Sequence, residues 1–211
     1  MTPDLTEAPV GPLRLAQLTA TDARRLLASN PRLLVPVGTM IARGPHLPLG
    51  CDSLVLERLT DDLSAALGIA RAPVIPYGVH GHRDPEAPGS VSLTRKTLHR
   101  LMNELIAGWE TEAKVSDVII LTTHAAEAHL EALSTIRTTG RVTLIDIYAA
   151  PLPDDIARLP IETALLMWLA PSLVDRTLIP PAMPRDPDLG ERLYRHLLAF
   201  ATEQIRTLTK S

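Results

Sequence analysis

The sequence predicts an α/β protein in which a largely parallel or mixed sheet is covered by helices. From Arg32 to Tyr148, short apolar runs alternate with loops and with segments of helical periodicity. This alternation is typical of strands that are joined by crossover helices. The 211 residues suit one large domain, because a chain of this size buries enough apolar surface to fold without a disulfide. We therefore predict a flexible N-terminal arm over residues 1–12 and a single domain over residues 13–211.

Each predicted element has a local signal. A helix is expected over Thr19–Asn30, where Thr19 or Thr21 is the N-cap and Asp22 lies in the first turn. Short apolar runs between Pro, Gly or polar residues predict five strands: Arg32–Val37, Ala72–Tyr77, Ser90–Leu93, Asp117–Thr122 and Arg141–Tyr148. Apolar residues at helical spacing predict five further helices: Asp52–Leu67 with Gly68 as C-cap, Thr94–Ala113, Ala125–Ile136, Glu162–Leu169 and Leu189–Thr207.

Composition narrows the classes of function. The net charge is −3 and no block of Lys or Arg is present, which argues against a nucleic-acid partner. Cys51 is the only cysteine, which excludes a disulfide framework and a Cys-rich zinc site and fits a reducing compartment. The polar N-terminus lacks the features of a signal peptide, and no apolar run is long enough to span a membrane. We expect a cytoplasmic protein without a membrane partner.

Polar residues with chemical potential follow the predicted strands, where sites form in parallel sheets. The segment GTMIARGPHLPLGCD places His46 and Asp52 between a strand and a helix, although Asp52 is equally suited to be that helix's N-cap. His80 and His82 are two residues apart, which in an extended segment puts both rings on one side, as two metal ligands require. The alternative is that both histidines lie on the surface.

A third cluster follows the most apolar strand. His124 lies at the junction of strand and helix, and Glu127 and His129 lie on the predicted helix. The spacing of three lets His124 and Glu127 share a helix face, while the alternative is a cap followed by solvated helix charges. Glu162 is either a site residue or a first-turn acid that suits the helix dipole. Together these loops indicate a pocket able to bind a divalent metal through nitrogen and oxygen ligands.

Four segments resemble the motifs of the creatininase (creatinine amidohydrolase) family. GTMIARGPHLPLGCD resembles G-S-x-E-Q-H-G-P-H-L-P-L-x-x-D, and YGVHGHRDPEAPGSVSL resembles a Y-G stretch with a histidine followed by P-G-T-x-S-L. DVIILTTHAAEAHLEAL is similar to V-x-x-x-N-G-H-G-G-N-x-x-x-L, and IETALLMWLAPSLVD to E-T-S-L-x-L-x-L-x-P-x-L-V-D. The resemblance runs from about Leu33 to Asp175 and keeps the order of the motifs.

The resemblance implies a three-layer α/β/α sandwich with a mixed, mostly parallel sheet, and a homo-oligomer. It implies a binuclear Zn or Mn site that activates water against a small amide, cyclic amide or formamide. By position, Asp52 matches the family's bridging carboxylate and His124 a metal-binding histidine. Glu162 matches the glutamate of the last motif, which the resemblance places near the metals.

Departures from the motifs fall on ligand positions. Ile41 stands where the first motif has glutamate, and Arg43 where it has histidine. The histidine before the last motif is missing, with Ile156 or Ala157 near its place. Arg43 is a permanent cation without a lone pair, so it repels a divalent ion, and it can occupy the space of a metal and pair with Asp52. We expect at most one Zn or Mn per chain, or none.

Two functions stay open. In the first, the chain is a hydrolase of C–N bonds with one metal. In the second, it is an inactive homologue that binds a small ligand through Arg43 or acts as a partner in a complex. A third interpretation is a chance resemblance on an unrelated α/β domain. For the hydrolase, the roles are divided as follows: metal ligands Asp52 and His124; a further ligand from Glu162, His46, His82 or Glu127; catalytic groups Glu162 and His46; substrate contacts Arg43 and His82.

Overall fold

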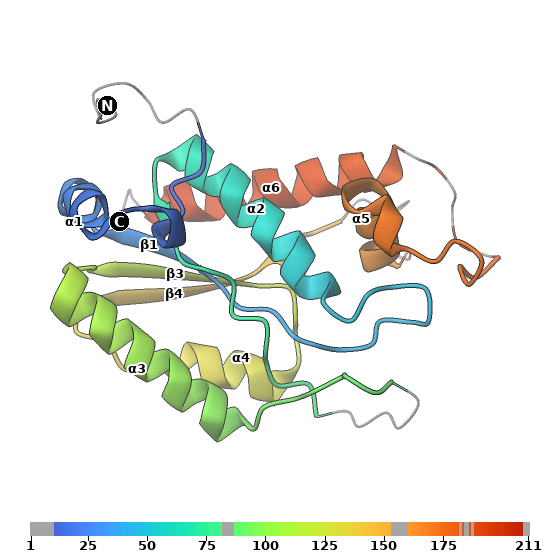
Figure 1. Cartoon of the computed structure of the whole chain (residues 1–211), viewed down its shortest axis with the longest axis horizontal. Coiled ribbons are helices and arrows are strands. Elements are labelled where there is room, and N and C mark those ends of the chain that lie inside the picture. The colour runs from blue at the N-terminus through green and yellow to red at the C-terminus, as the bar shows by residue number, and fades with distance from the viewer. Residues whose placement is uncertain are drawn as a thin grey trace.

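A four-stranded parallel sheet forms the centre of the molecule (Figure 1). The computed structural model describes residues 11–81, 87–152, 160–181, 183, 186 and 188–208, so most of the predicted arm lies outside them. The strands are β1 (Arg32–Pro36), β2 (Ala70–Arg71), β3 (Asp117–Thr122) and β4 (Arg141–Asp146), in the order β2-β1-β3-β4. All pairs of these strands are parallel, and antiparallel pairing among the described residues is limited to an isolated Met40–Val91 bridge.

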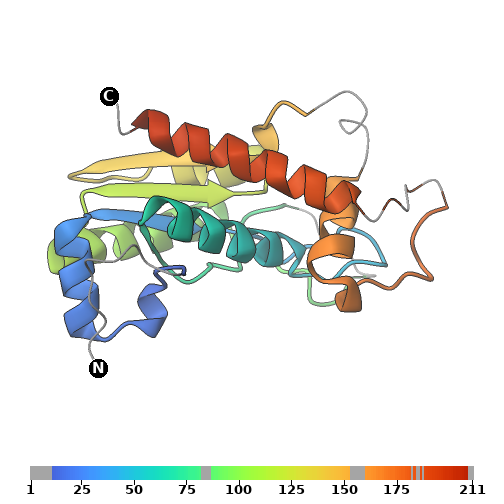
Figure 2. The same cartoon turned by 90° about the horizontal axis from the view of Figure 1, so that it is seen from above.

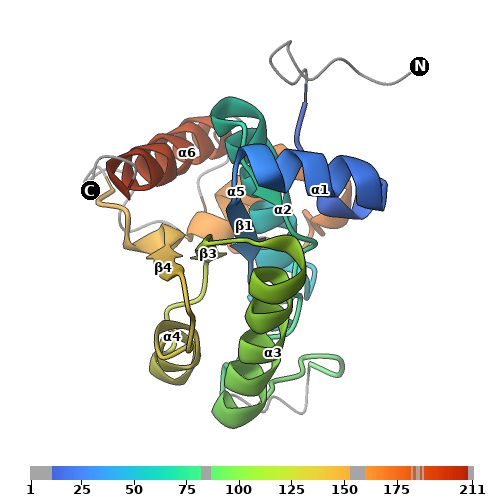
Figure 3. The same ribbon diagram turned by 90° about the vertical axis from the view of Figure 1, so that its left-hand side faces the viewer.

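Helices cover both faces of the sheet, which confirms the predicted α/β/α layers (Figure 3). One face packs against α1 (Ala20–Ser29), α3 (Arg95–Ala113) and α4 (Glu127–Ser134). The other packs against α2 (Cys51–Leu67), α5 (Ile161–Leu169) and α6 (Leu189–Leu208). Short 3₁₀ turns lie at Leu15–Gln17, Ile147–Ala149 and Pro171–Leu173. Among the helices of the described ranges, none is both long and apolar enough to span a membrane.

The central strands are apolar on both faces, as buried parallel strands must be. Neighbouring residues of β1 alternate between two core clusters: Leu34 packs toward α2, and Leu33 and Val35 pack toward α3. In β3, Ile119 and Ile120 alternate in the same way. Every residue of β3 is buried. A strand that is buried on both faces needs a continuous apolar run, and this run was the clearest strand signal in the sequence.

Three strand predictions differ from the structure in extent. Over residues 72–77, Ile75 makes only an isolated bridge to Val37, because Pro73 and Pro76 lack the N–H groups that a ladder needs. Residues 90–93 are likewise reduced to the Met40–Val91 bridge. The last strand ends at Asp146 rather than at residue 148, because the Asp146 side chain accepts a hydrogen bond from the Tyr148 amide and begins a 3₁₀ turn.

Helix ends follow the predicted chemistry closely. The Thr19 hydroxyl accepts a hydrogen bond from the Asp22 amide at the start of α1. Thr94 caps α3 in the same way through the Thr97 amide. Gly68 ends α2 in the left-handed region, with φ of 63°, where glycine is favoured over any residue with a Cβ atom.

The crossing of α5 and α6 depends on a glycine (Figure 2). A Cβ atom on Gly190 would lie 2.2 Å from the Ala164 carbonyl oxygen and 2.6 Å from the Trp168 Cβ. We expect Gly190→Ala to lower the free energy of unfolding by about 3 kcal/mol in urea denaturation, because the two backbones must separate. Gly108→Ala is the matched control: its Cβ would meet nothing within 4 Å, so a gain of about 0.5–1 kcal/mol is expected from helix propensity. Equal effects of the two substitutions would contradict this account.

Candidate functional site

The guanidinium of Arg43 lies at the centre of the site. Its Nη2 is 3.0 Å and 3.1 Å from the two Asp52 carboxylate oxygens and 3.2 Å from His124 Nδ1. Its Nη1 is 3.2 Å from Glu162 Oε1. These partners come from α2, from the loop after β3 and from α5. Four predicted site residues from separate segments therefore meet at the carboxyl edge of the sheet.

The loop over residues 37–50 positions Arg43 between β1 and α2. Its ends are tied by a hydrogen bond from the Ile41 amide to the Leu49 carbonyl, 3.2 Å long. Gly44 has φ of +126°, which lets the chain turn directly after Arg43 at a conformation that side chains with a Cβ disfavour. Arg43 is thereby held over the first turn of α2, with its side chain 21% exposed.

Asp52 is a buried partner of Arg43 and not a helix cap. Gly50 holds the N-cap position of α2, and Asp52 lies in the first turn, so N-capping was the wrong alternative. Its side chain is fully buried and accepts hydrogen bonds from Arg43 and from the Thr39 hydroxyl. Burial raises the pKa of the Asp52 carboxyl, while the Arg43 charge and the Thr39 hydroxyl oppose that shift.

The contact with Arg43 fixes the tautomer of His124. Because a guanidinium has only donors, His124 Nδ1 must accept from Arg43, and the ring proton of the neutral imidazole is on Nε2. Burial, together with the charge of Arg43, lowers the pKa of His124 to about 4. His124 precedes α4, which begins at Glu127, so the predicted shared helix face of these two residues is wrong.

His129 is buried beneath the site, which contradicts the alternative of a solvated helix charge. It is fully buried, accepts a hydrogen bond from the Val79 amide at 3.2 Å and donates through Nε2 to the Thr122 hydroxyl at 3.0 Å. Burial lowers the pKa of His129 to about 3. The ring connects β3, α4 and the loop that follows residue 78, so its role in the structure is to hold these elements together.

The other predicted residues divide into three cases. His46 is buried and hydrogen-bonds through Nε2 to the Thr163 hydroxyl at 2.8 Å, so its partner is the residue that follows Glu162, and it is not among the hydrogen-bond or ion-pair partners of Arg43. Glu127 is exposed at the start of α4 and belongs to the surface. His82 lies outside the described residues.

Two further residues lie near the centre: His80, which the sequence offered as a possible metal ligand, and Tyr148, which it did not assign to the site. His80 acts electrostatically on Asp52 and His124. Burial, together with the nearby carboxylates of Glu162 and Asp52, raises the pKa of the Tyr148 hydroxyl. The Tyr148 hydroxyl and both ring nitrogens of His80 are buried without a hydrogen-bond partner among the described residues. The spacing of His80 and His82 was a sequence signal for His80. The sequence held no such signal for Tyr148, which was the last residue of a predicted strand.

These side chains, as placed, do not fit a divalent metal ion. Both oxygens of Asp52 and the Nδ1 lone pair of His124 are directed at Arg43, and Ile41 offers no donor atom. Over the described ranges, no group of three or more His, Cys, Asp or Glu side chains is arranged to hold a metal. A metal ion here would have to displace a cation that forms two ion pairs.

The layered fold and the polar centre place the chain in the class of α/β proteins whose site lies at the carboxyl edge of a parallel sheet. Comparison with known proteins then identifies its family. The creatinine amidohydrolase (creatininase) family model matches residues 16–209, so the chain belongs to the creatininase family. This confirms the resemblance of the motifs. The chain is 29% identical over 132 residues to the mycofactocin precursor peptide peptidase of Mycolicibacterium smegmatis, covering 59% of this chain and 52% of that protein.

Other relatives agree. The 3-dehydro-scyllo-inosose hydrolase of Thermotoga maritima is 27% identical over 122 residues, covering 57% of this chain but 38% of that protein. The matched part of the chain thus spans about half of the first curated relative and less of the second. A manganese creatininase structure superposes with a TM-score of 0.77 at 18% identity, over 93% of this chain and 98% of that one. A mutant creatininase of Zn–Zn type gives a TM-score of 0.78, also at 18% identity and with the same coverage.

Proposed function

We propose that this chain is a creatininase-family protein that binds a small neutral ligand without a catalytic metal. The observation that carries the proposal is the Arg43 guanidinium, which is bonded to Asp52, His124 and Glu162. These are the three residues that match the family's metal-site positions. The cation of the site is therefore a side chain, and amide hydrolysis by metal-activated water is not the activity that this geometry supports.

The free polar atoms around Arg43 favour a ligand that accepts hydrogen bonds. Arg43 Nε, His124 Nε2 and the Tyr148 hydroxyl are buried without a partner among the described residues, and buried polar groups are nearly always hydrogen-bonded. The first two are N–H donors and the hydroxyl can donate. One positive and two negative side chains, Arg43 against Asp52 and Glu162, leave a net charge of −1, which disfavours an anion. A neutral amide or carbonyl compound fits both conditions.

A metal analysis tests the first half of the proposal. The natural protein and the variant Ile41→Glu/Arg43→His are purified without chelator, and Zn and Mn are measured by elemental analysis. We expect no stoichiometric metal in the natural protein and about one equivalent or more in the variant, because the variant regains a carboxylate and an imidazole as ligands. Arg43→Lys, which keeps the cation, is the matched control and should stay metal-free. An equivalent of metal in the natural protein, with turnover of amide or formamide substrates, would instead establish a one-metal hydrolase.

A ligand titration tests the second half. N-methylacetamide and acetate are titrated separately while the ring resonances of His124 and Tyr148 are followed by NMR. The neutral amide should shift both rings saturably, whereas acetate should not, because the centre carries net negative charge. Preference for acetate, or the same response to both probes, would reject the proposed ligand class.

A further inference from the structure

A cavity lies on the opposite side of α2 from Asp52. It has a volume of about 540 Å³, within the usual range for small-molecule sites. From α2 it is lined by Leu54, Glu57, Arg58 and Asp61, which at 100° per residue cluster on the helix face opposite Asp52. The cavity is therefore separate from the site around Arg43, with the body of the helix between them.

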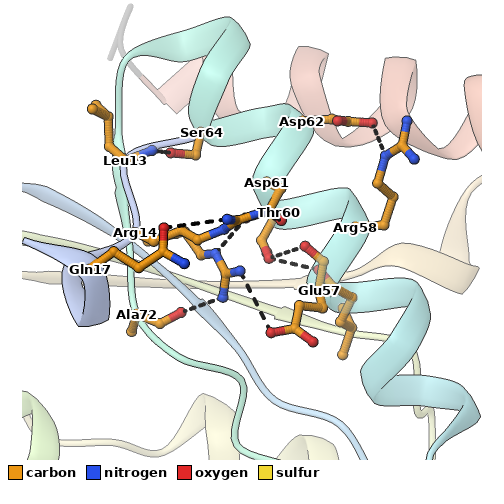
Figure 4. Close-up of polar contacts among 12 residues, drawn as sticks. Leu13, Arg14, Gln17, Glu57, Arg58, Thr60, Asp61, Asp62, Ser64 and Ala72 are labelled. Carbon is orange, nitrogen blue, oxygen red and sulfur yellow. Dashed lines mark hydrogen bonds and ion pairs between the residues drawn. The ribbon is translucent and has the colours of Figure 1, made fainter. Parts of the chain in front are cut away.

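Arg14 and Arg71 share the carboxylate of Asp61 in this cavity; Figure 4 labels Arg14 and Asp61. Arg14 binds Asp61 through Nε at 2.9 Å and Nη2 at 2.6 Å, and Arg71 binds the same carboxylate through Nε at 2.7 Å. Burial opposes ionisation of Asp61, but the hydrogen bonds from both arginines lower its pKa overall. The Arg71 side chain is only 5% exposed. Two cations held against one carboxylate, that of Asp61, whose side chain is 14% exposed, leave an excess positive charge at the cavity wall.

The excess charge is only weakly compensated. Glu57 Oε1 is 3.6 Å from Arg71 Nη2, beyond hydrogen-bond distance, and the Glu57 side chain is 51% exposed. Each guanidinium has five N–H donors. Within the described chain, the Arg71 guanidinium makes only one further hydrogen bond, from Nη1 to the Ala72 carbonyl at 3.4 Å. The Arg14 guanidinium likewise makes one, to Gln17, also at 3.4 Å. Several donors of two fixed guanidinium groups are thus available at the wall.

Apolar side chains form another part of the wall. Leu54 of α2 and Leu169 and Ala170 at the end of α5 line the cavity with the arginines. We propose that this cavity binds a small organic carboxylate, whose oxygens pair with Arg71 and Arg14 and whose aliphatic part packs on Leu54 and Leu169. Arginine forks match a carboxylate in charge and in geometry. A ligand carboxylate competes with Glu57, the half-exposed partner, and leaves the hydrogen-bonded Asp61 pairs in place.

The proposal is tested with hexanoate as the probe and hexanamide as its neutral counterpart. Binding is followed by ¹H–¹⁵N NMR, in which the amides of Glu57, Asp61 and Arg71 report on this cavity and those of Asp52 and His124 on the other site. We expect hexanoate to bind about tenfold more tightly than hexanamide, because only the carboxylate forms charge-assisted bonds. Shifts should be confined to the first group of amides, so the outcome is independent of the function proposed for Arg43.

Two variants separate a binding site from a merely structural ion-pair network. Glu57→Gln removes the competing carboxylate and should tighten hexanoate binding roughly threefold. Glu104→Gln is the control, because it removes an exposed glutamate that pairs with Arg100 on α3, and it should leave hexanoate binding unchanged. Leu54→Trp fills the cavity and should abolish binding while keeping the Asp61 pairs. Equal affinity for hexanoate and hexanamide, or unchanged binding in Leu54→Trp, would overturn the proposal and leave the arginines as anchors of the N-terminal segment.

Discussion

Replacing Arg43 with alanine is expected to lower the free energy of unfolding by about 3–5 kcal/mol at pH 7, which is the cost of breaking a buried ion pair. The reason is the fully buried Asp52 carboxylate, which would keep only the Thr39 hydroxyl as a partner among the contacts described above. Protonation of Asp52 limits the loss, because a neutral carboxyl no longer needs a counter-charge. The loss should therefore be smaller at pH 5 than at pH 7. Urea denaturation at both pH values measures it.

A double-mutant cycle distinguishes the ion pair from simple loss of side-chain volume. Arg43→Ala combined with Asp52→Asn removes both charges, so the double variant should be about 2 kcal/mol more stable than the sum of the single effects predicts. The matched control is the cycle of Arg100→Ala with Glu104→Gln, since this pair is exposed on α3 and surface pairs contribute about 0–1 kcal/mol. Additive effects of Arg43→Ala and Asp52→Asn would show that the pair does not stabilise the centre.

Acidification should destabilise the protein well above the pH at which surface carboxylates titrate. The pKa of His124 is lowered to about 4 and that of His129 to about 3, whereas both titrate near 6.5 when unfolded. Between these values the unfolded state binds more protons than the folded state, so stability that is present above pH 6.5 is lost as the pH falls. The two histidines together should remove about 5 kcal/mol between pH 7 and pH 4.5. The raised pKa of Asp52 acts in the opposite direction.

A variant isolates the contribution of one histidine. His129→Gln retains a donor and an acceptor for the Thr122 hydroxyl and the Val79 amide but cannot take up a proton. The variant should be less stable than the natural protein at pH 7, and the difference should shrink by about 2–3 kcal/mol by pH 4.5. The measurement is the free energy of unfolding in urea at half-unit pH steps. Parallel pH curves for the two proteins would contradict a neutral, buried His129.

The sequence predicted the local features of this fold better than its long-range contacts. Caps such as Thr19 and Gly68 and the continuous apolar run of β3 depend on neighbouring residues, and these predictions are confirmed. The strand expected over residues 72–77 is reduced to an isolated bridge at Ile75, next to the two-residue strand β2, because Pro73 and Pro76 have no N–H group to donate to a partner strand.

The site shows the same division. Arg43 and Asp52 are nine residues apart and belong to one motif, so their pairing was accessible from the sequence. Tyr148 approaches the centre only because a 3₁₀ turn interrupts the segment after β4, and periodicity does not predict such a turn. His129 was placed on the correct helix, but the amide that fixes its ring comes from Val79, fifty residues earlier.

The guanidinium among Asp52, His124 and Glu162 has a consequence for how the protein is supplied with its central cation. A metal ion is acquired from solution and lost again according to its dissociation constant and the free metal concentration. Arg43 is covalently attached, so every folded copy contains one cation at this position from the moment of synthesis. Each folded chain therefore contains one such cation, and a chelator cannot remove it.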